Sequence, residues 1–125
     1  MANECIPFYE PGGNVPCHAT AGVTGCRFVN ISANRQADGS ISVAHATAAG
    51  VAFGVSKYDA ATGEKVGVVR GPGFIVPVMA GGTIAAGARV EVGTTGQAVT
   101  IAAGIAVGIA VAGATNGVLA QIALL

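Results

Sequence analysis

The stretch Gly50-Val51-Ala52-Phe53-Gly54-Val55 returns 54 positions later as Gly104-Ile105-Ala106-Val107-Gly108-Ile109. Each copy is followed at the same distance by a turn sequence, Ala60-Ala61-Thr62-Gly63 or Ala114-Thr115-Asn116-Gly117. A short apolar run then follows in both places. Neither copy carries a residue suited to catalysis, so this repeated sequence, which we call the echo, has a structural role. It predicts that one small β unit is used twice in this chain.

The echo extends toward the N-terminus with a small shift in spacing. Val15-Pro16 leads to a glycine-flanked turn, and Val76-Pro77 leads to a similar one before the next apolar run. We therefore expect a single β domain over residues 15–125, built from copies at about 15–70 and 76–124. We expect the copies to pack about an approximate twofold axis.

Short apolar segments follow one another, separated by turn signals such as Asp38-Gly39 and Asn116-Gly117, in which glycine adopts left-handed backbone angles without a Cβ penalty. No segment has a sustained helical period. Regular short strands with Gly-rich turns are typical of an all-β protein, either a small barrel or a sandwich. The expected strands are 15–19, 26–32, 40–46, 51–55, 64–70, 74–79, 89–92, 97–101, 105–111 and 118–124.

The composition favours association with other protein chains. Charged residues make up 10% of the 125 residues, against about 25% in ordinary soluble domains, and the formal net charge is zero. Few charges and a net charge near zero promote self-association. The balance also gives no basic surface for phosphates, so nucleic acid is not an expected partner.

Residues 1–14 have the character of an extended arm. Pro7 and Pro11 exclude a regular helix, and Gly12-Gly13 forms a turn or hinge. Large apolar side chains need a surface to lie on, and this segment carries Ile6, Phe8 and Tyr9. That surface is either the protein's own body or a neighbouring chain.

The run from Ile105 to Val111 alternates large and small residues. We expect its β-branched side chains to face the core, and its small residues, Ala106, Gly108 and Ala110, to lie against another chain. The apolar run from Ala98 to Ala112 is shorter than the roughly 20 residues that a spanning helix needs, and its period is that of a strand. A membrane is therefore not an expected partner.

No pattern of residues points to an enzyme, a metal site or a cofactor. The chain has neither a Gly-x-Ser-x-Gly elbow nor a Gly-Lys-Ser/Thr phosphate loop. The spacing of the three cysteines, Cys5, Cys17 and Cys26, matches no metal motif, and reduced thiols are the default without a secretory signal. We expect His45 to be a packed or edge histidine. A carrier-type β domain is an alternative, but Lys65 lacks the flanking residues of a modified lysine.

The order of motifs after Phe74 resembles that of a known family. An apolar strand is followed by Ala80-Gly81-Gly82-Thr83-Ile84, by Arg89-Val90-Glu91-Val92 and by the Gly104–Ala110 run, and Gly117 precedes a terminal strand. This arrangement resembles the small capsid decoration proteins, also called cement or head-stabilising proteins, of tailed bacteriophages.

The resemblance implies a virion structural protein that is made in the host cytoplasm and bound to the outer surface of the capsid. It implies that the protein stabilises the head by bridging major capsid protein subunits, commonly as a homotrimer. An alternative is another phage structural module, such as a tail part or a head-fibre base.

Overall fold

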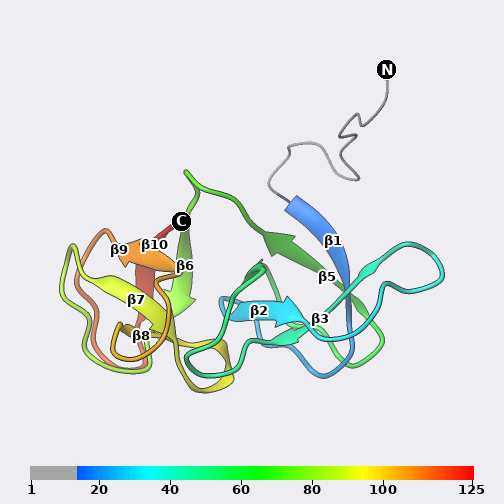
Figure 1. Ribbon diagram of the computed structural model, residues 1–125, viewed down its shortest axis with the longest axis horizontal. Helices are drawn as coiled ribbons and strands as arrows, with labels where there is room; N and C mark the ends of the chain where they lie inside the picture. Colours follow the sequence, from blue (N-terminus) through cyan, green and yellow to red (C-terminus); the bar gives the residue numbers. More distant parts are fainter. Residues whose placement is uncertain (1–13) are drawn as a thin grey trace.

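The computed structural model describes residues 14–125, which form ten strands in two five-stranded sheets placed side by side (Figure 1). We call residues 14–70 the first unit and residues 71–125 the second unit. The first sheet is a closed barrel with strand order β1-β3-β2-β4-β5. Its strands are β1 (Asn14–Ala19), β2 (Phe28–Ile31), β3 (Ile41–His45), β4 (Gly54–Ser56) and β5 (Lys65–Val69).

The second sheet has the order β6-β10-β9-β7-β8. Its strands are β6 (Ile75–Met79), β7 (Arg89–Val92), β8 (Ala98–Thr100), β9 (Gly108–Ala110) and β10 (Leu119–Leu124), with a short 3₁₀ turn η1 (Thr94–Gly96) between β7 and β8. The fold is therefore all-β and built from two similar units, as the sequence predicts.

The two sheets share the same strand pairing, register included. The first and last strands of each unit run antiparallel, so that Val15 pairs with Val68 and Val76 pairs with Ile122. The inner antiparallel strand pairs, β2 with β4 and β7 with β9, also correspond, because Val29 pairs with Gly54 and Val90 pairs with Gly108. Three further pairings match in the same way. Val29 pairs with His45 as Val90 pairs with Thr100, and Val55 pairs with Val69 as Ile109 pairs with Ala123. The bridge between Val23 and Ala60 corresponds to the bridge between Ile84 and Ala114.

The units differ in how their sheets close. In the first unit, β1 and β3 form a parallel ladder from Cys17 to Ala19. The second unit has one parallel bridge at the equivalent place, between Ala80 and Ala98. The connection after β2 is also longer than the η1 turn after β7. This insertion explains why the sequence echo shifts its spacing along the chain.

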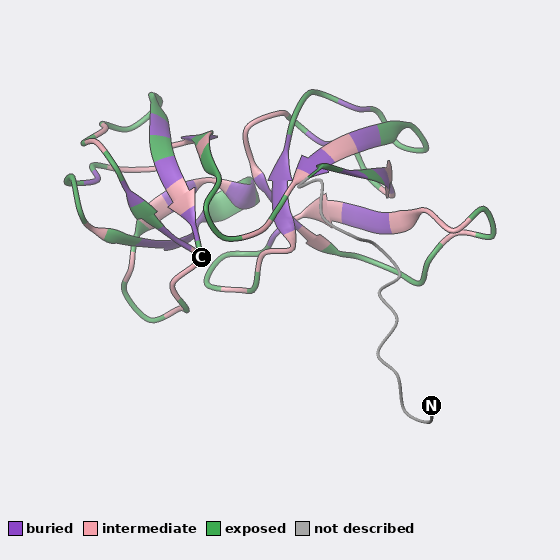
Figure 2. Cartoon of the chain, turned by 90° about the horizontal axis from the view of Figure 1, so that it is seen from above, coloured by how far each residue is buried: buried purple, intermediate pink, exposed green. Residues whose placement is uncertain are grey.

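Each unit has its own apolar core (Figure 2). The barrel of the first unit encloses Cys17, Val29, Val66 and further small side chains. The core of the second unit contains the equivalent inward positions and is extended by Phe28, Ala46 and Val55 of the first unit. Since Phe28 and Val55 are buried on the outside of the first barrel, the two units pack together through an apolar contact.

Backbone hydrogen bonds also join the units. The Met79 N–H donates to the Cys26 carbonyl at 2.9 Å, and the Ala49 N–H donates to the Val92 carbonyl at 2.8 Å. Arg27 Nη1 donates to the carbonyl and the hydroxyl of Thr95. A twofold axis would give each contact a reciprocal one, but Phe28 and Val55 are buried against the second unit whereas their counterparts Arg89 and Ile109 are exposed. The expected twofold packing of the copies is therefore wrong.

The repeated glycines of the echo are needed for close packing. A Cβ on Gly54 would lie 2.5 Å from Val68 Cγ1, and a Cβ on Gly108 would lie 2.3 Å from Ile122 Cγ2. Val68 and Ile122 occupy equivalent places on the last strand of each unit. Carbon atoms in contact are normally 3.5–4.0 Å apart, so neither position has room for a side chain.

Candidate interaction surface

From Gly108 to Val111 the two faces are the reverse of the sequence expectation, whereas Val107 packs against the second core as expected. The strand is only Gly108–Ala110, and both of these small residues are buried against the second core, because Ile122 fills the space beside them. The β-branched residues Ile105, Ile109 and Val111 are exposed instead. The prediction that Gly108 and Ala110 lie on a surface facing another chain is wrong for this protomer.

Glu91 holds the loop that precedes this run. Glu91 lies on β7 and is 6% exposed. The Ala102 N–H donates to Glu91 Oε1 at 3.0 Å, and the Gly104 N–H donates to Oε2 at 2.6 Å. Backbone groups bound in this way do not take part in the sheet.

The outward side chains of β6, β9 and β10 form a continuous surface, which we call the apolar face. Leu119 of β10 pairs with Met79 of β6, and Ala123 lies between Ile75 and Ile109. The members of this face are Ile75, Pro77, Met79, Ile109, Val111, Leu119, Gln121 and Ala123. Gln121 is its only polar member, and Arg89, the register partner of Ile109, stands at its rim.

The apolar face is well exposed in this protomer. Ile75 is 59% exposed, Val111 49% and Leu119 48%. Val118, which precedes β10 at the edge of the face, is 50% exposed. Single exposed apolar residues are common on proteins, but a contiguous group of this kind marks an interaction site.

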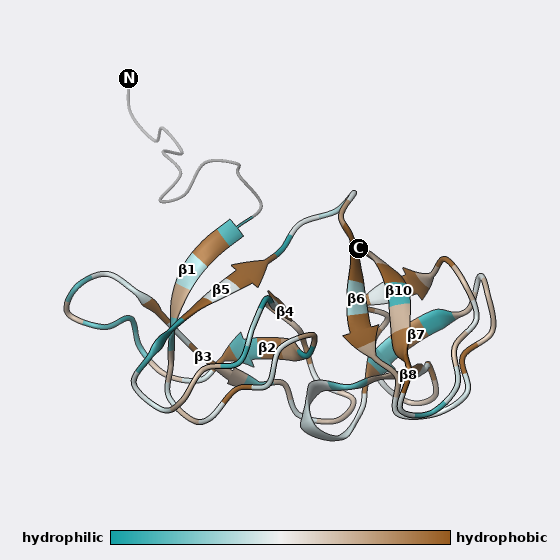
Figure 3. Ribbon diagram, turned by 180° about the vertical axis from the view of Figure 1, so that it is seen from behind, coloured by the Kyte–Doolittle hydropathy of each residue, from teal (hydrophilic) through white to brown (hydrophobic). Residues whose placement is uncertain are grey.

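The first unit carries charges where the second unit is apolar. The pairings that relate the units place Lys57, Glu64 and Lys65 at the positions of Val111, Val118 and Leu119. Figure 3 shows the contrast, with β6 and β10 largely brown and the outer loops of the first unit rich in teal. The second unit contains two charged residues, Arg89 and Glu91, whereas the first contains eight: Arg27, Arg35, Asp38, Lys57, Asp59, Glu64, Lys65 and Arg70.

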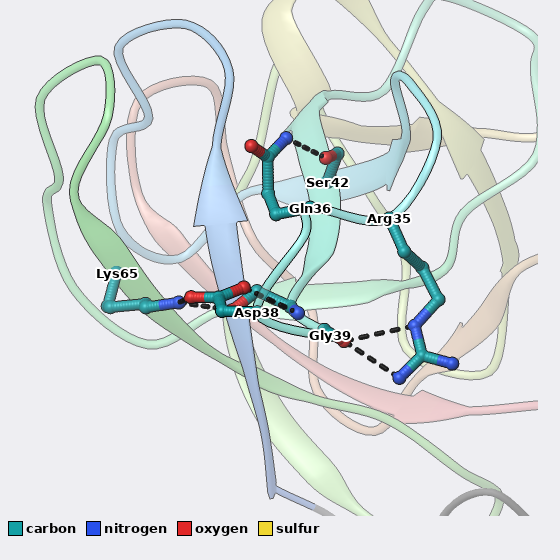
Figure 4. Close-up of polar contacts among 7 residues, drawn as sticks. Arg35, Gln36, Asp38, Gly39, Ser42 and Lys65 are labelled. Atoms are coloured by element: carbon teal, nitrogen blue, oxygen red, sulfur yellow. Dashed lines mark hydrogen bonds and ion pairs between the residues drawn. The ribbon is translucent and has the colours of Figure 1, made fainter.

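Three of these charged residues, Arg35, Asp38 and Lys65, take part in polar contacts at the loop between β2 and β3 (Figure 4). Lys65 Nζ lies 2.8 Å from Asp38 Oδ2 and also contacts Ser40. The hydrogen bond from Lys65, followed by those from Ser40, holds the pKa of Asp38 well below its usual range. Arg35 donates twice to the Gly39 carbonyl, at 3.0 and 2.8 Å. This end of the protein is therefore suited to solvent.

A second apolar feature is a groove of about 290 Å³ between the units. Residues 51–54 line it on one side, and the corresponding residues 105–107 of the second unit line it on the other. Residues 70–71, the corresponding residues 124–125, Phe28 and Pro72 complete the lining. Arg70 stacks on the Phe53 ring at 4.4 Å from its centroid and donates to the Phe53 carbonyl. Ala106, one of the small residues singled out in the sequence, is in this lining.

The reactive groups of the described residues are used structurally. The Thr24 N–H donates to His45 Nε2 at 2.9 Å, and burial, together with the charge of Arg27, lowers the pKa of His45. Burial raises the pKa of the Cys17 thiol to about 11, against the smaller effects of Arg70 and Lys65. Within residues 14–125, no three His, Cys, Asp or Glu side chains are grouped to hold a metal ion.

Two further findings concern the expected partners. Over the described part of the chain, no helix has the length and hydropathy needed to cross a membrane. The arm residues Ile6, Phe8 and Tyr9 lie outside the described residues. Their role in contacts remains a prediction.

Known proteins place the chain among bacteriophage structural proteins. The family model for the phage cement protein matches residues 10–124. The chain therefore belongs to the phage cement protein family, and the resemblance found in the sequence is confirmed. No curated protein matches it.

A solved structure has the same fold. The chain is similar to the head fiber gp8.5 N base of bacteriophage phi29, with 26% sequence identity and a TM-score of 0.75. The match covers 90% of this chain and 92% of the other. Together with the family match, this similarity identifies a capsid-associated structural protein of a bacteriophage.

Proposed function

We propose that this protein, made in the host cytoplasm, binds the outer surface of a phage capsid and stabilises it by bridging major capsid protein subunits. The observation that carries the proposal is the cement-protein match over residues 10–124. A cement role needs surface complementarity rather than reactive groups. The second unit, with an exposed apolar face and few charges, supplies a surface suited to protein contacts.

We propose that the protein acts as a homotrimer. Several linked copies raise the avidity for a shell that offers repeated sites, because binding of the second and third copies becomes intramolecular. A modest contact per copy then suffices, well below what an isolated 12.1 kDa protein would need for tight binding.

The segment 1–14 has a proposed contact role in the same assembly. Ile6, Phe8 and Tyr9 would anchor it on a neighbouring subunit or on the shell. Ala106 remains a proposed contact residue because it lines the groove between the units. Gly108 and Ala110 are replaced in this role by the exposed side chains on the other side of β9.

Binding to purified heads tests the proposed function. Heads that lack the protein are mixed with increasing amounts of it, sedimented, and the bound protein is quantified. We expect saturable binding at a fixed ratio to the major capsid protein, and retention of DNA at higher temperature than in bare heads. A variant lacking residues 1–13 should reach lower occupancy. Absence of binding, or binding without any gain in head stability, would contradict the proposal.

A head-fibre base is the second candidate function. The similarity to the head fiber gp8.5 N base of bacteriophage phi29 favours it. In that case the compact domain would be the attachment part of a fibre rather than a complete cement protein. Mass spectrometry of purified virions discriminates, because peptides C-terminal to Leu125 would show that a longer protein is present in the particle.

A further inference from the structure

We propose that the apolar face, the outer surface of β6, β9 and β10, binds a second copy of this chain. This inference rests on the proposed function, because it names the surface through which the cement protein would associate with itself. The face is defined by exposed Ile75, Val111 and Leu119 and by the single polar side chain of Gln121.

The first argument is the internal comparison between the units. The same backbone, with the same strand pairing, carries Lys57 and Lys65 in the first unit and Val111 and Leu119 in the second. All four side chains are exposed in the protomer. The fold therefore accommodates lysine at these positions. An apolar residue there serves a contact outside the protomer.

The second argument is that one end of the equivalent face of the first unit, at β2 and β4, is already an interface. Phe28 and Val55 project outward from the first barrel and are buried against the second core. Their counterparts in the second unit are Arg89 and Ile109, which are exposed. This end of the face thus has a shape that packs against a neighbouring β unit, and in the second unit nothing among residues 14–125 covers it.

The chemistry of the face favours a second copy over the capsid shell as its occupant. Interfaces between permanently associated copies are more apolar and poorer in charge than interfaces that form between separately folded proteins. A cement protein meets its shell only after synthesis. Before then, a face without charge would remain in water unless another copy covered it.

The test compares the double variant Val111→Lys/Leu119→Lys with the wild type by size-exclusion chromatography and light scattering. The variant restores the lysines that the first unit carries at these places, so we expect the fold and the circular dichroism spectrum to be retained. The wild type should elute as an oligomer, and the variant should fall to 12.1 kDa at the same concentration. Self-association should weaken at least a hundredfold.

A matched control places the same added charge on the first unit. Ile31 and Tyr58 are 52% and 51% exposed and lie outside the groove between the units, so Ile31→Lys/Tyr58→Lys should keep the oligomeric mass of the wild type. A monomeric wild type, a double variant of unchanged mass, or a control that dissociates equally would overturn the inference.

Head binding measured in parallel separates this inference from the proposed function. If the wild type is an oligomer that the double variant disrupts but does not bind heads, the inference stands and the proposed function fails. If the wild type binds heads while the double variant keeps its mass, the proposed function stands and the inference fails. A double variant of unchanged mass that no longer binds heads would assign the face to the shell.

Discussion

Replacing Gly108 by alanine should destabilise the protein strongly, although the change adds a single methyl group. Its Cβ would lie 2.3 Å from Ile122 Cγ2 and 2.9 Å from the Ala123 carbonyl oxygen. A normal carbon contact is at least 3.5 Å, so Ile122 must move by more than 1 Å or rotate away from its preferred rotamer. Ile122 is fully buried, so it cannot turn into solvent without leaving the core.

The loss in the free energy of unfolding follows from two opposing effects. Overpacking in a well-packed core costs about 1–3 kcal/mol, and an off-rotamer side chain adds about 1 kcal/mol. Alanine restricts the unfolded chain and returns about 0.5 kcal/mol. The net loss is about 1.5–3.5 kcal/mol, which lowers the midpoint of thermal unfolding by roughly 5–14 °C in a domain of this size.

Differential scanning calorimetry at one protein concentration measures this loss, since association would shift the midpoint. Gly82→Ala is the control, because a Cβ there meets no atom within 4 Å and its backbone is not left-handed. It should leave the midpoint within about 2 °C of the wild type. Equal midpoints for Gly108→Ala and Gly82→Ala would refute the argument from close packing.

Three further predictions concern single groups. Cys26 has φ +58° where its counterpart Gly87 has φ +82°, so Cys26→Gly should raise the unfolding midpoint slightly and Gly87→Ala should lower it, by about 1 kcal/mol in a denaturant titration. Glu91→Gln replaces an acceptor of two backbone N–H groups by one acceptor and one donor, and should cost about 1–3 kcal/mol in urea unfolding; no change would mean that the loop does not depend on the carboxylate. The pKa of His45 is lowered in the folded state, so the unfolded chain takes up the proton first and stability should fall as the pH drops below 6.5; unfolding midpoints between pH 8 and 5 should show a smaller fall in His45→Gln, and an identical fall would contradict it.

The strands were predictable because turn residues separate them so regularly. Each of the ten expected segments overlaps a strand, and the strand at residues 89–92 has the expected bounds. Gly39, Gly63 and Gly117 have positive φ, as turn glycines at these places require. The local echo also pointed correctly to two similar units, since it preserves positions where no side chain fits.

The orientation of β9 could not be predicted from its own residues. Alternation shows that the two faces of a strand differ, but it does not show which face is inside. The choice is made by Ile122, a large residue on the neighbouring strand that occupies the space beside Gly108. A comparison of the last strands would have given a signal, because Val66 and Val68 correspond to Ala120 and Ile122 in the two cores.

The site was harder to predict than the fold because it depends on the correspondence between the units. The loop between β2 and β3 is longer than its counterpart η1, which shifts the spacing of the echo. The offset of 54 residues aligns Lys65 with Leu119, but only the structure shows that both side chains lie exposed on the outer face of their sheets. The role of Glu91 could not be predicted either, since its partners are backbone N–H groups of a distant loop and leave no signal in the sequence.

The most direct test of the cement function is electron cryo-microscopy of heads that lack the protein, imaged before and after its addition. The account predicts extra density on the outer surface, into which the two β units fit, with each copy touching more than one major capsid subunit. Density that touches a single subunit, density confined to the tail, or heads without added density would contradict it.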